Sequence, residues 1–136
     1  MSKFHLEIVT PDRKFFEGEV EMVIVRGMDG DLAILKGRSP IATPLKICKV
    51  RIFQDDVERA AAVVEGYVTA IDNHVTIVTE AAEWPDEIDI NRAEEAKKRA
   101  EALLEKQTID INFARASSAL QRAINRLEVS SLNKND

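Results

Sequence analysis

The sequence predicts an α+β protein in which an all-β N-terminal domain, a ~10-stranded antiparallel β-sandwich, is followed by two antiparallel helices. Two observations predict this fold class. Through residue 84, short apolar-polar alternations are separated by turn-forming residues, which is typical of antiparallel sandwiches. From Asp89 to Lys106 the chain has no Gly or Pro, and its apolar residues recur at helical spacing. We therefore expect a β-sandwich domain over residues 1–84 and a helical hairpin over residues 85–136.

Period-two alternation and intervening turns predict the individual strands. Phe4, Leu6 and Ile8 alternate with polar neighbours, so one face of the first strand should be buried. Pro44 makes its strand an edge or a broken strand, because proline has no N–H to donate. Residues 17–19, Glu-Gly-Glu, are expected to interrupt the β-structure between two strands. The expected strands cover residues 3–9, 15–16, 20–25, 32–35, 41–45, 48–52, 60–64, 67–71 and 75–78, with turns at 26–31, 36–40, 54–56 and 72–73.

The second domain is predicted to be a pair of amphipathic helices. Its expected segments are a linker over residues 80–87, a helix over 89–106, a break over 107–110, a second helix with its apolar stripe from 113 to 127, and a frayed tail over 130–136. Asp86 or Asp89 can cap the first helix, since a short side-chain acceptor satisfies free N–H groups of the first turn. Both apolar stripes are thin and rich in alanine, so the hairpin is marginal alone. It must dock on another surface, and we expect more than one conformation.

Composition restricts the class of protein. The net charge of −5 argues against nucleic-acid binding by the whole molecule. Cys48, the single cysteine, lies in an apolar run, which favours a core residue over a reactive thiol and fits a reducing compartment. The N-terminus lacks the apolar region of a signal peptide, and no apolar run is long enough to span a bilayer. Any association with a membrane is therefore expected to come through a partner.

Five arginines mark the helical half. They are Arg92 and Arg99 on the first helix and Arg115, Arg122 and Arg126 on the second. At about 100° per residue, each set falls within a band roughly 40° wide that borders the apolar stripe. Residues 111–127 contain no acid, which suggests an acidic partner or ligand. Antiparallel packing would let both rows face one cleft suited to phosphate or carboxylate, although such arginines can also cover an apolar seam or pair with a nearby Glu.

Several kinds of site are not expected. The sequence contains no glycine-rich phosphate loop and nothing that resembles a nucleophile elbow or a Ser/His/Asp set. His5 and His74 are far apart, one in a strand and the other in a turn, so we expect no metal pair. Catalysis by this chain alone is therefore not expected.

Along essentially its whole length, the chain resembles the epsilon subunit of the bacterial F-type (rotary) ATP synthase. The resemblance rests on short motifs that occur together and in order: Leu6-Glu7-Ile8-Val9-Thr10-Pro11, Glu17-Gly18-Glu19-Val20, Gly30-Asp31-Leu32-Ala33-Ile34-Leu35, Pro40, Leu45, Gly66-Tyr67-Val68, Asn73-His74-Val75-Thr76-Ile77-Val78, Ala81-Ala82-Glu83, residues 88–96 and residues 119–127.

The resemblance implies a role in a rotary complex. The sandwich would bind the gamma subunit and the membrane c-ring of a proton-translocating synthase, which places the chain at the cytoplasmic face of the cell membrane as a peripheral subunit. The hairpin would either fold on the sandwich or extend along gamma toward the catalytic alpha and beta subunits. In the extended form it would inhibit ATP hydrolysis, with residues 111–127 meeting acidic loops of the beta subunits.

The resemblance extends to an ATP-binding variety of the family, whose pattern I/L-Asp-x-x-Arg-Ala stands here as residues 88–93. It implies that ATP is a regulatory ligand, with the need for Mg²⁺ left open. Glu83, Ile88, Asp89 and Ala93 would hold the adenosine end, and the phosphates would be held by Arg92, Arg99, Arg115, Arg122 and Arg126. Two alternatives remain: the same stalk and inhibitor subunit without ATP sensing, and a free-standing ATP-binding protein.

Overall fold

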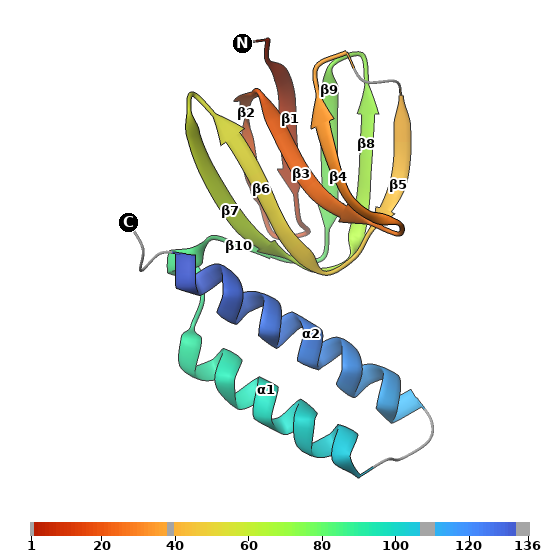
Figure 1. The fold of residues 1–136 in the computed structure, drawn as a ribbon, viewed down its shortest axis with the longest axis vertical. Coiled ribbons are helices and arrows are strands. Elements are labelled where there is room, and N and C mark those ends of the chain that lie inside the picture. Colours follow the sequence, from red (N-terminus) through yellow and green to blue (C-terminus); the bar gives the residue numbers. More distant parts are fainter. Residues whose placement is uncertain (1, 38–39, 107–110, 133–136) are drawn as a thin grey trace. The chain divides into compact units, whose positions relative to one another are not determined.

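The computed structural model describes residues 2–37, 40–106 and 111–132 of the chain. The chain divides into two compact units, residues 1–83 and residues 84–136. The boundary expected from sequence lay one residue later, after residue 84. Each unit is taken by itself below, and Figure 1 labels the elements of both.

The first unit is a β-sandwich of two five-stranded sheets (Figure 1). The first sheet has the strand order β2 (Lys14–Val20), β1 (Phe4–Val9), β9 (His74–Thr79), β8 (Gly66–Ile71) and β5 (Ile41–Leu45). The second has the order β10 (Ala82–Glu83), β7 (Val57–Val63), β6 (Cys48–Gln54), β3 (Met22–Gly27) and β4 (Gly30–Leu35). The predicted fold class is thereby confirmed. Strand β5, which contains Pro44, lies at a sheet edge, where a missing N–H is tolerated.

Alternating side chains from both sheets form the core of the sandwich. Phe4, Leu6 and Ile8 of β1 are buried, as the alternation predicts. Val50 and Ile52 of β6 are buried in the same way. Because successive side chains of a strand point to opposite faces, the residues between them are left on the outer face. The position of His5 and Glu7 on that outer face follows directly from the burial of their neighbours.

Cys48 is buried at the start of β6, and burial is the main cause that raises the pKa of its thiol. A buried thiol with a raised pKa has little thiolate character and is therefore unreactive. The prediction of a core cysteine is confirmed.

One strand pair departs from the antiparallel expectation. Strands β1 and β9 pair in parallel, with His5 opposite His74 and Leu6 opposite Val75. Parallel neighbours need a long connection, and here the connection includes most of the sandwich. The pairing brings the first and last long strands of the unit side by side (Figure 1).

Two tight turns have the backbone that their sequences suggest. Asp55 and Asp56 have φ values of 52° and 65°, and Asp72 and Asn73 have φ values of 51° and 61°. Positive φ at both central residues is the mark of a type I′ turn, whose twist matches the flanking strands, and Asp and Asn tolerate it better than most residues. Both predicted turns are confirmed.

Four local predictions about the sandwich and the linker are wrong. The loop expected over residues 26–31 is shorter, because β3 continues to Gly27 and β4 begins at Gly30. The expected break at residues 17–19 lies inside β2, where Gly18 pairs opposite Leu6. The expected strand over residues 20–25 is divided, because β2 ends at Val20 and β3 begins at Met22. At the division, Glu21 N–H donates to the carbonyl of Phe53, so the chain changes sheets without losing its hydrogen bond. The expected linker over 80–87 contains the short strand β10 and the 3-10 turn η1 (Pro85–Glu87).

The second unit is a pair of helices, α1 (Ile90–Glu105) and α2 (Ile111–Leu132), packed against each other in an antiparallel hairpin (Figure 1). The frayed tail predicted from residue 130 is wrong for its first residues, because α2 continues to Leu132. Val129 and Ser130 are buried, and the Ser130 hydroxyl donates to the carbonyl of Leu127. Residues 133–136 and the predicted break at 107–110 lie outside the described residues.

Neither of the described helices is both long and apolar enough to cross a membrane.

Candidate functional site

The first turn of α1 is fixed by a short series of hydrogen bonds. Trp84 N–H donates to Oε1 of Glu87 at 2.9 Å, and Glu87 N–H donates to the Trp84 carbonyl at 3.0 Å. Asp89 then takes an extended backbone, and its Oδ1 accepts the Arg92 N–H at 3.1 Å. This is N-capping by a short acidic side chain, which satisfies one free donor and places a negative charge at the positive end of the helix. Of the two expected caps, Asp86 and Asp89, the second is the one used.

Small residues form the seam between the helices. Ala93 and Ala100 of α1 and Ala116 and Ala123 of α2 are buried. Within each helix these alanines stand seven residues apart, so they lie on one face. Because a methyl group is all that each contributes, these four residues let the two backbones approach closely and themselves bury little apolar area. We call these four residues the alanine seam.

An arginine immediately precedes every alanine of the seam. The pairs are Arg92-Ala93, Arg99-Ala100, Arg115-Ala116 and Arg122-Ala123. The residue that precedes a seam alanine is rotated by about 100° around the helix axis from that alanine. On two antiparallel helices that face each other, this rotation leads to the same side of the interface. Packing through the alanine seam therefore places all four arginines along one flank. Arg126, which follows Arg122 by four residues, falls on that flank as well.

Acidic residues of α1 lie on the opposite flank. Glu94 and Glu101 each follow a seam alanine, so they are rotated by about 100° in the other direction. The corresponding positions of α2 hold Ser117 and Ile124, which carry no charge. The arginines and these two glutamates therefore lie on opposite sides of the seam, as the repeated tripeptide Arg-Ala-Glu of α1 indicates.

Four of the five arginines of this flank, all except Arg126, have no neutralising partner among the described residues. Within the described part of the chain, the side chains of Arg92, Arg99, Arg115 and Arg122 make no ion pair or hydrogen bond. The alternative of pairing with a Glu one turn away is therefore not seen for these four arginines in the described residues, although Glu95 stands four residues before Arg99. Arg92, Arg99 and Arg115 are exposed, whereas Arg122 and Arg126 are half-buried. Like charges left together in this way favour an anion or an acidic partner.

The remaining predicted site residues lie in different environments. Ile88 is buried and directly precedes the Asp89 cap, and Ala93 belongs to the alanine seam. Glu83 is half-buried on β10 in the other unit, where it pairs opposite Ala62 of β7. The roles expected for Glu83, Ile88, Asp89 and Ala93 toward an adenosine group stay predictions.

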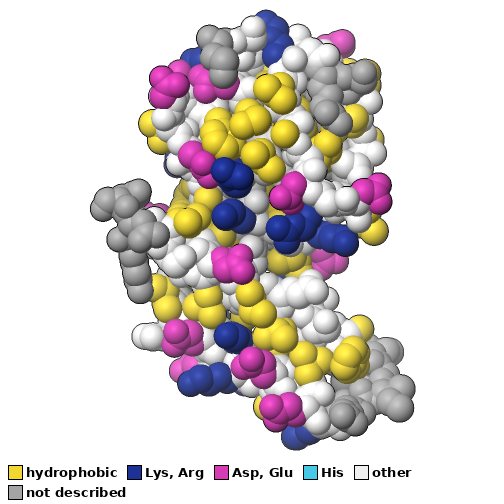
Figure 2. All heavy atoms as spheres, in the orientation of Figure 1, with side chains coloured by type: hydrophobic (Ala, Val, Ile, Leu, Met, Phe, Trp, Pro, Cys, Tyr) yellow, Lys and Arg dark blue, Asp and Glu magenta, His cyan; other side chains and the backbone are white. Residues whose placement is uncertain are grey.

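Apolar side chains are exposed on both units (Figure 2). In the sandwich, Tyr67 of β8 and Val78 of β9 are paired across strands, and both are more than half exposed, at 61% and 53%. In the hairpin, Leu103 and Phe113 are about equally exposed, at 49% and 51%. Contiguous exposed apolar side chains mark surfaces that bind other proteins.

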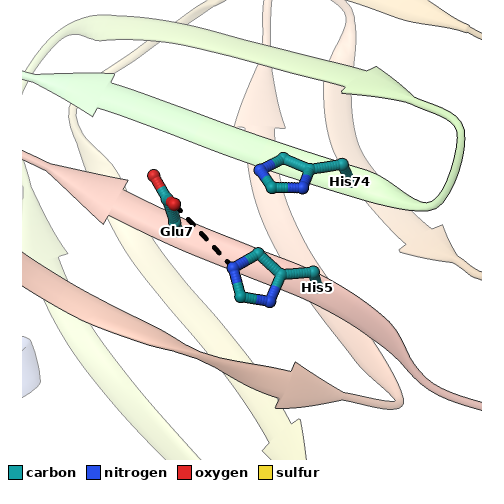
Figure 3. A group of neighbouring side chains, drawn as sticks. All are labelled: His5, Glu7 and His74. Carbon is teal, nitrogen blue, oxygen red and sulfur yellow. Dashed lines mark ion pairs between the residues drawn. The ribbon is translucent and has the colours of Figure 1, made fainter.

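The separation expected for His5 and His74 is wrong. Parallel pairing of β1 with β9 brings their ring centroids to 4.7 Å, and Glu7 lies beside them (Figure 3). No local signal could have revealed this neighbourhood, because it depends on a pairing between the first and ninth strands. Hydrogen bonding to Glu19 is the largest cause that raises the pKa of His5, followed among the raising causes by hydrogen bonding to Glu17.

Comparison with known proteins agrees with this architecture. The family profile described as "ATP synthase, Delta/Epsilon chain, beta-sandwich domain" matches residues 3–85, and the one described as "ATP synthase, Delta/Epsilon chain, long alpha-helix domain" matches residues 86–131. In fold, the chain is similar to a chain of the Euglena gracilis mitochondrial ATP synthase, OSCP/F1/c-ring, with a TM-score of 0.83 at 18% identity over 96% of this chain and 82% of that one.

Curated relatives cover nearly the full length. The chain is 44% identical to the ATP synthase epsilon chain of Caldicellulosiruptor saccharolyticus over 95% of this chain and 94% of the relative. It is 47% identical to the ATP synthase epsilon chain of Alkaliphilus metalliredigens over 93% of this chain and 94% of the relative. With both domains matched and with relatives of this identity and coverage, the chain belongs to the ATP synthase epsilon chain family.

Proposed function

We propose that the chain is the non-catalytic epsilon subunit of the central stalk of a proton-translocating F-type ATP synthase, and that its hairpin inhibits ATP hydrolysis unless bound ATP holds it closed. The observation that carries the regulatory part concerns Arg92, Arg99, Arg115 and Arg122, which line one flank of the alanine seam and have no neutralising partner among the described residues. Family membership supports the stalk role.

Two kinds of surface support the proposed partners. The exposed apolar side chains of the sandwich, including Tyr67 and Val78, offer a surface for the gamma subunit and the c-ring. The acid-free segment over residues 111–127 offers a basic surface for acidic loops of the beta subunits within the alpha/beta ring. Through the c-ring the chain sits at the cytoplasmic face of the cell membrane without entering it, and it takes no nucleic-acid partner.

ATP suits the arginine flank for a chemical reason. A triphosphate presents several oxygens with a high negative charge, and a guanidinium group donates two parallel hydrogen bonds to such oxygens. Arg92, Arg99, Arg115, Arg122 and Arg126 would hold the phosphates, as the family pattern implies. Glu83, Ile88, Asp89 and Ala93 would hold the adenosine end. Such a site needs no glycine-rich loop, because side chains supply the donors that backbone amides supply elsewhere.

The regulatory step is a population shift between two hairpin conformations. A ligand that binds only the closed hairpin stabilises it by RT ln(1 + [ATP]/Kd), which is about 2.7 kcal/mol at a hundred times Kd. The thin alanine seam leaves the closed hairpin marginal, so a shift of this size decides which conformation dominates. When ATP falls, the open hairpin becomes available to the catalytic ring.

Calorimetric titration of the full chain with ATP, with and without Mg²⁺, tests the sensing part. We expect saturable binding that weakens at least tenfold in the Arg122→Glu/Arg126→Glu variant. Lys98→Glu is the matched control, because Lys98 is exposed on α1 away from the arginine flank and its reversal should leave ATP affinity unchanged. No binding at millimolar ATP would refute ATP sensing and leave the stalk role intact.

A second reading keeps the stalk role without ATP sensing, and the exposure of Arg92, Arg99 and Arg115 is compatible with it. In that case the arginines serve only contacts with the beta subunits. The Arg122→Glu/Arg126→Glu variant separates the two readings when it is assembled into the complex. Inhibition weakens under both, whereas ATP affinity of the isolated chain changes only if the flank binds ATP.

A further inference from the structure

The outer face of the sheet formed by β2, β1 and β9 gathers two imidazoles and three carboxylates. His5 of β1 and His74 of β9 are paired in register, and their ring centroids are 4.7 Å apart. Glu7 follows His5 by two residues, so it emerges on the same face (Figure 3). On the other side of β1, Glu19 pairs opposite His5 and Glu17 opposite Glu7. Three neighbouring strands of the sheet therefore contribute to one cluster, and one of them, β9, is distant in sequence from β1 and β2.

The donor atoms of this cluster are close enough to share one ion. His5, Glu7 and His74 each offer one donor atom, and these atoms all lie within 4.8 Å of one another. Around a tetrahedral zinc ion with bonds of ~2.0–2.1 Å, neighbouring donors are about 3.3 Å apart. Nε2 of His5 is 3.8 Å from Oε1 of Glu7, so small side-chain rotations reach that spacing. Two imidazoles and one carboxylate form a ligand set that zinc uses with a fourth position left open.

The neighbouring carboxylates complete the surroundings of such an ion. Oε2 of Glu17 is 3.0 Å from Nε2 of His5, closer to that nitrogen than Oε1 of Glu7 at 3.8 Å, so it is the carboxylate nearest to this proposed ligand. Oε2 of Glu19 is 2.9 Å from Nδ1 of His5, the ring nitrogen that would face away from the ion. A carboxylate on the far nitrogen of a metal-binding histidine fixes the ring and raises its basicity. Glu19 is therefore a positioning residue, whereas Glu17 is placed to act as a ligand.

The cluster is partly shielded and keeps an excess of negative charge. The side chains of His5 and Glu7 are 29% and 22% exposed. Lys14 lies beside the carboxylates, with Nζ 3.0 Å from Oε1 of Glu17 and 3.9 Å from Oε1 of Glu7. With neutral imidazoles, three carboxylates and one ammonium leave a local charge of −2, which attracts a divalent cation.

We propose that His5, His74 and Glu7 form a binding site for a divalent transition-metal ion, best suited to Zn²⁺, with Glu17 at the fourth position. Imidazole nitrogens select zinc and its neighbours over Mg²⁺ and Ca²⁺, which prefer oxygen ligands. The bound ion would link β1 to β9, the parallel pair that joins the start of the sandwich to its end. The proposal involves only sandwich residues and is independent of ATP binding by the hairpin.

Titration of the full-length, tag-free, chelator-treated chain with Zn²⁺ by calorimetry tests the site. We expect one Zn²⁺ per chain, no displacement by excess Mg²⁺, and visible d–d absorption of a tetrahedral ion when Co²⁺ replaces Zn²⁺. Zinc should also raise the thermal unfolding temperature, because a ligand of the folded state alone stabilises it. Absence of zinc binding by the wild-type chain would overturn the proposal.

Variants identify the ligands. His74→Ala should weaken zinc binding at least tenfold and abolish the Co²⁺ absorption, and His74 is exposed. Glu80→Gln is the control, because Glu80 is an exposed glutamate outside the cluster, and it should change neither property. Glu19→Gln should weaken binding by ~10–100-fold without loss of the tetrahedral spectrum, as expected of a positioning residue. Lys14→Gln should tighten it, since a competing cation is removed. Circular dichroism checks that each variant is folded, and unchanged zinc affinity in folded His74→Ala and Glu7→Gln would overturn the assignment.

Discussion

Replacing Asp89 tests whether the first turn of α1 is held by its cap. The Oδ1 of Asp89 accepts the Arg92 N–H at 3.1 Å. Loss of an N-cap acceptor costs about 1 kcal/mol, typically within 0.5–2 kcal/mol. Since 1.4 kcal/mol is tenfold in an equilibrium constant, Asp89→Ala should open the first turn about fivefold more often. The same turn carries Arg92, the first arginine of the flank.

The matched variant is Asp89→Ser, which keeps a short hydroxyl acceptor and removes only the charge. A charge at the helix N-terminus contributes about 0.3–1 kcal/mol when exposed, so the serine variant should lose less than the alanine variant. Hydrogen exchange of the Arg92 amide, followed by NMR, measures the opening directly. The order of amide protection should be wild type, then Asp89→Ser, then Asp89→Ala.

Equal exchange of the Arg92 amide in wild type and Asp89→Ala would refute the capping argument. Equal losses in the serine and alanine variants would assign the effect to the charge alone. The serine variant also tests the proposed ATP site, because it keeps the helix start and removes the carboxylate expected to hold the adenosine end. Under the proposed function, its ATP affinity should fall by more than its helix stability explains.

Three further predictions concern the packing and charges of the two units. Gly66→Ala should destabilise the sandwich by about 3 kcal/mol or more in urea unfolding, because a Cβ there would lie 2.0 Å from the Val78 carbonyl oxygen. Gly18→Ala should cost less, because the nearest atom to its Cβ is the flexible end of Gln54 at 3.1 Å. Ala123→Leu should overpack the alanine seam and destabilise the hairpin by ~1–3 kcal/mol, measured by thermal unfolding with circular dichroism. Ala114→Leu, at an exposed position of the same helix, should be nearly neutral. Equal unfolding temperatures of the two variants would contradict a tight seam. The hydrogen bond from Arg51 is the main cause that lowers the pKa of Glu58. The stability difference between wild type and Glu58→Gln should therefore be full above the ordinary glutamate pKa of about 4.3 and vanish as the pH falls through the lowered pKa. Urea titrations at several pH values measure this difference.

Local patterns were sufficient for the strands and most turns because each depends on neighbours in sequence. Phe4, Leu6 and Ile8 reveal their buried face by alternation alone. The pair Asp72-Asn73 reveals its turn through side chains that tolerate positive φ. The prediction of a break at Glu17-Gly18-Glu19 was wrong because a glycine in an edge strand looks like a turn residue in the sequence. Gly18 lies in a strand because it pairs opposite Leu6 of β1.

Long-range pairing could not be predicted in the same way. The parallel register of β1 and β9 places His5 beside His74, and no feature of either segment encodes it. The end of α2 shows a related effect, because a serine-rich tail has weak helix propensity by itself. Burial of Val129 and Ser130 overrides that propensity through packing.

The arginine flank was partly accessible to sequence reasoning, and the structure explains why. Helical periodicity places Arg92 with Arg99, and Arg115 with Arg122, in one row on each helix. That both rows share a flank requires knowing which residues form the seam, and burial of Ala93, Ala100, Ala116 and Ala123 supplies that knowledge. The sequence therefore predicts a row of arginines on each helix, and the packing of the helices places the two rows on the same flank.

The alanine seam and the arginine flank together determine how the closed hairpin responds to a ligand. Apolar burial contributes about 0.8 kcal/mol per buried CH₂, so a seam of methyl groups holds the helices with a small surplus. The guanidinium groups of Arg92, Arg99, Arg115 and Arg122 have no neutralising partner among the described residues. They work against that surplus, because like charges repel. An anion on the flank removes the repulsion and adds its own binding energy to the closed form. A seam of leucines would hold the helices together without help, and binding would then change little. The weakness of the seam is therefore what makes the hairpin sensitive to its ligand.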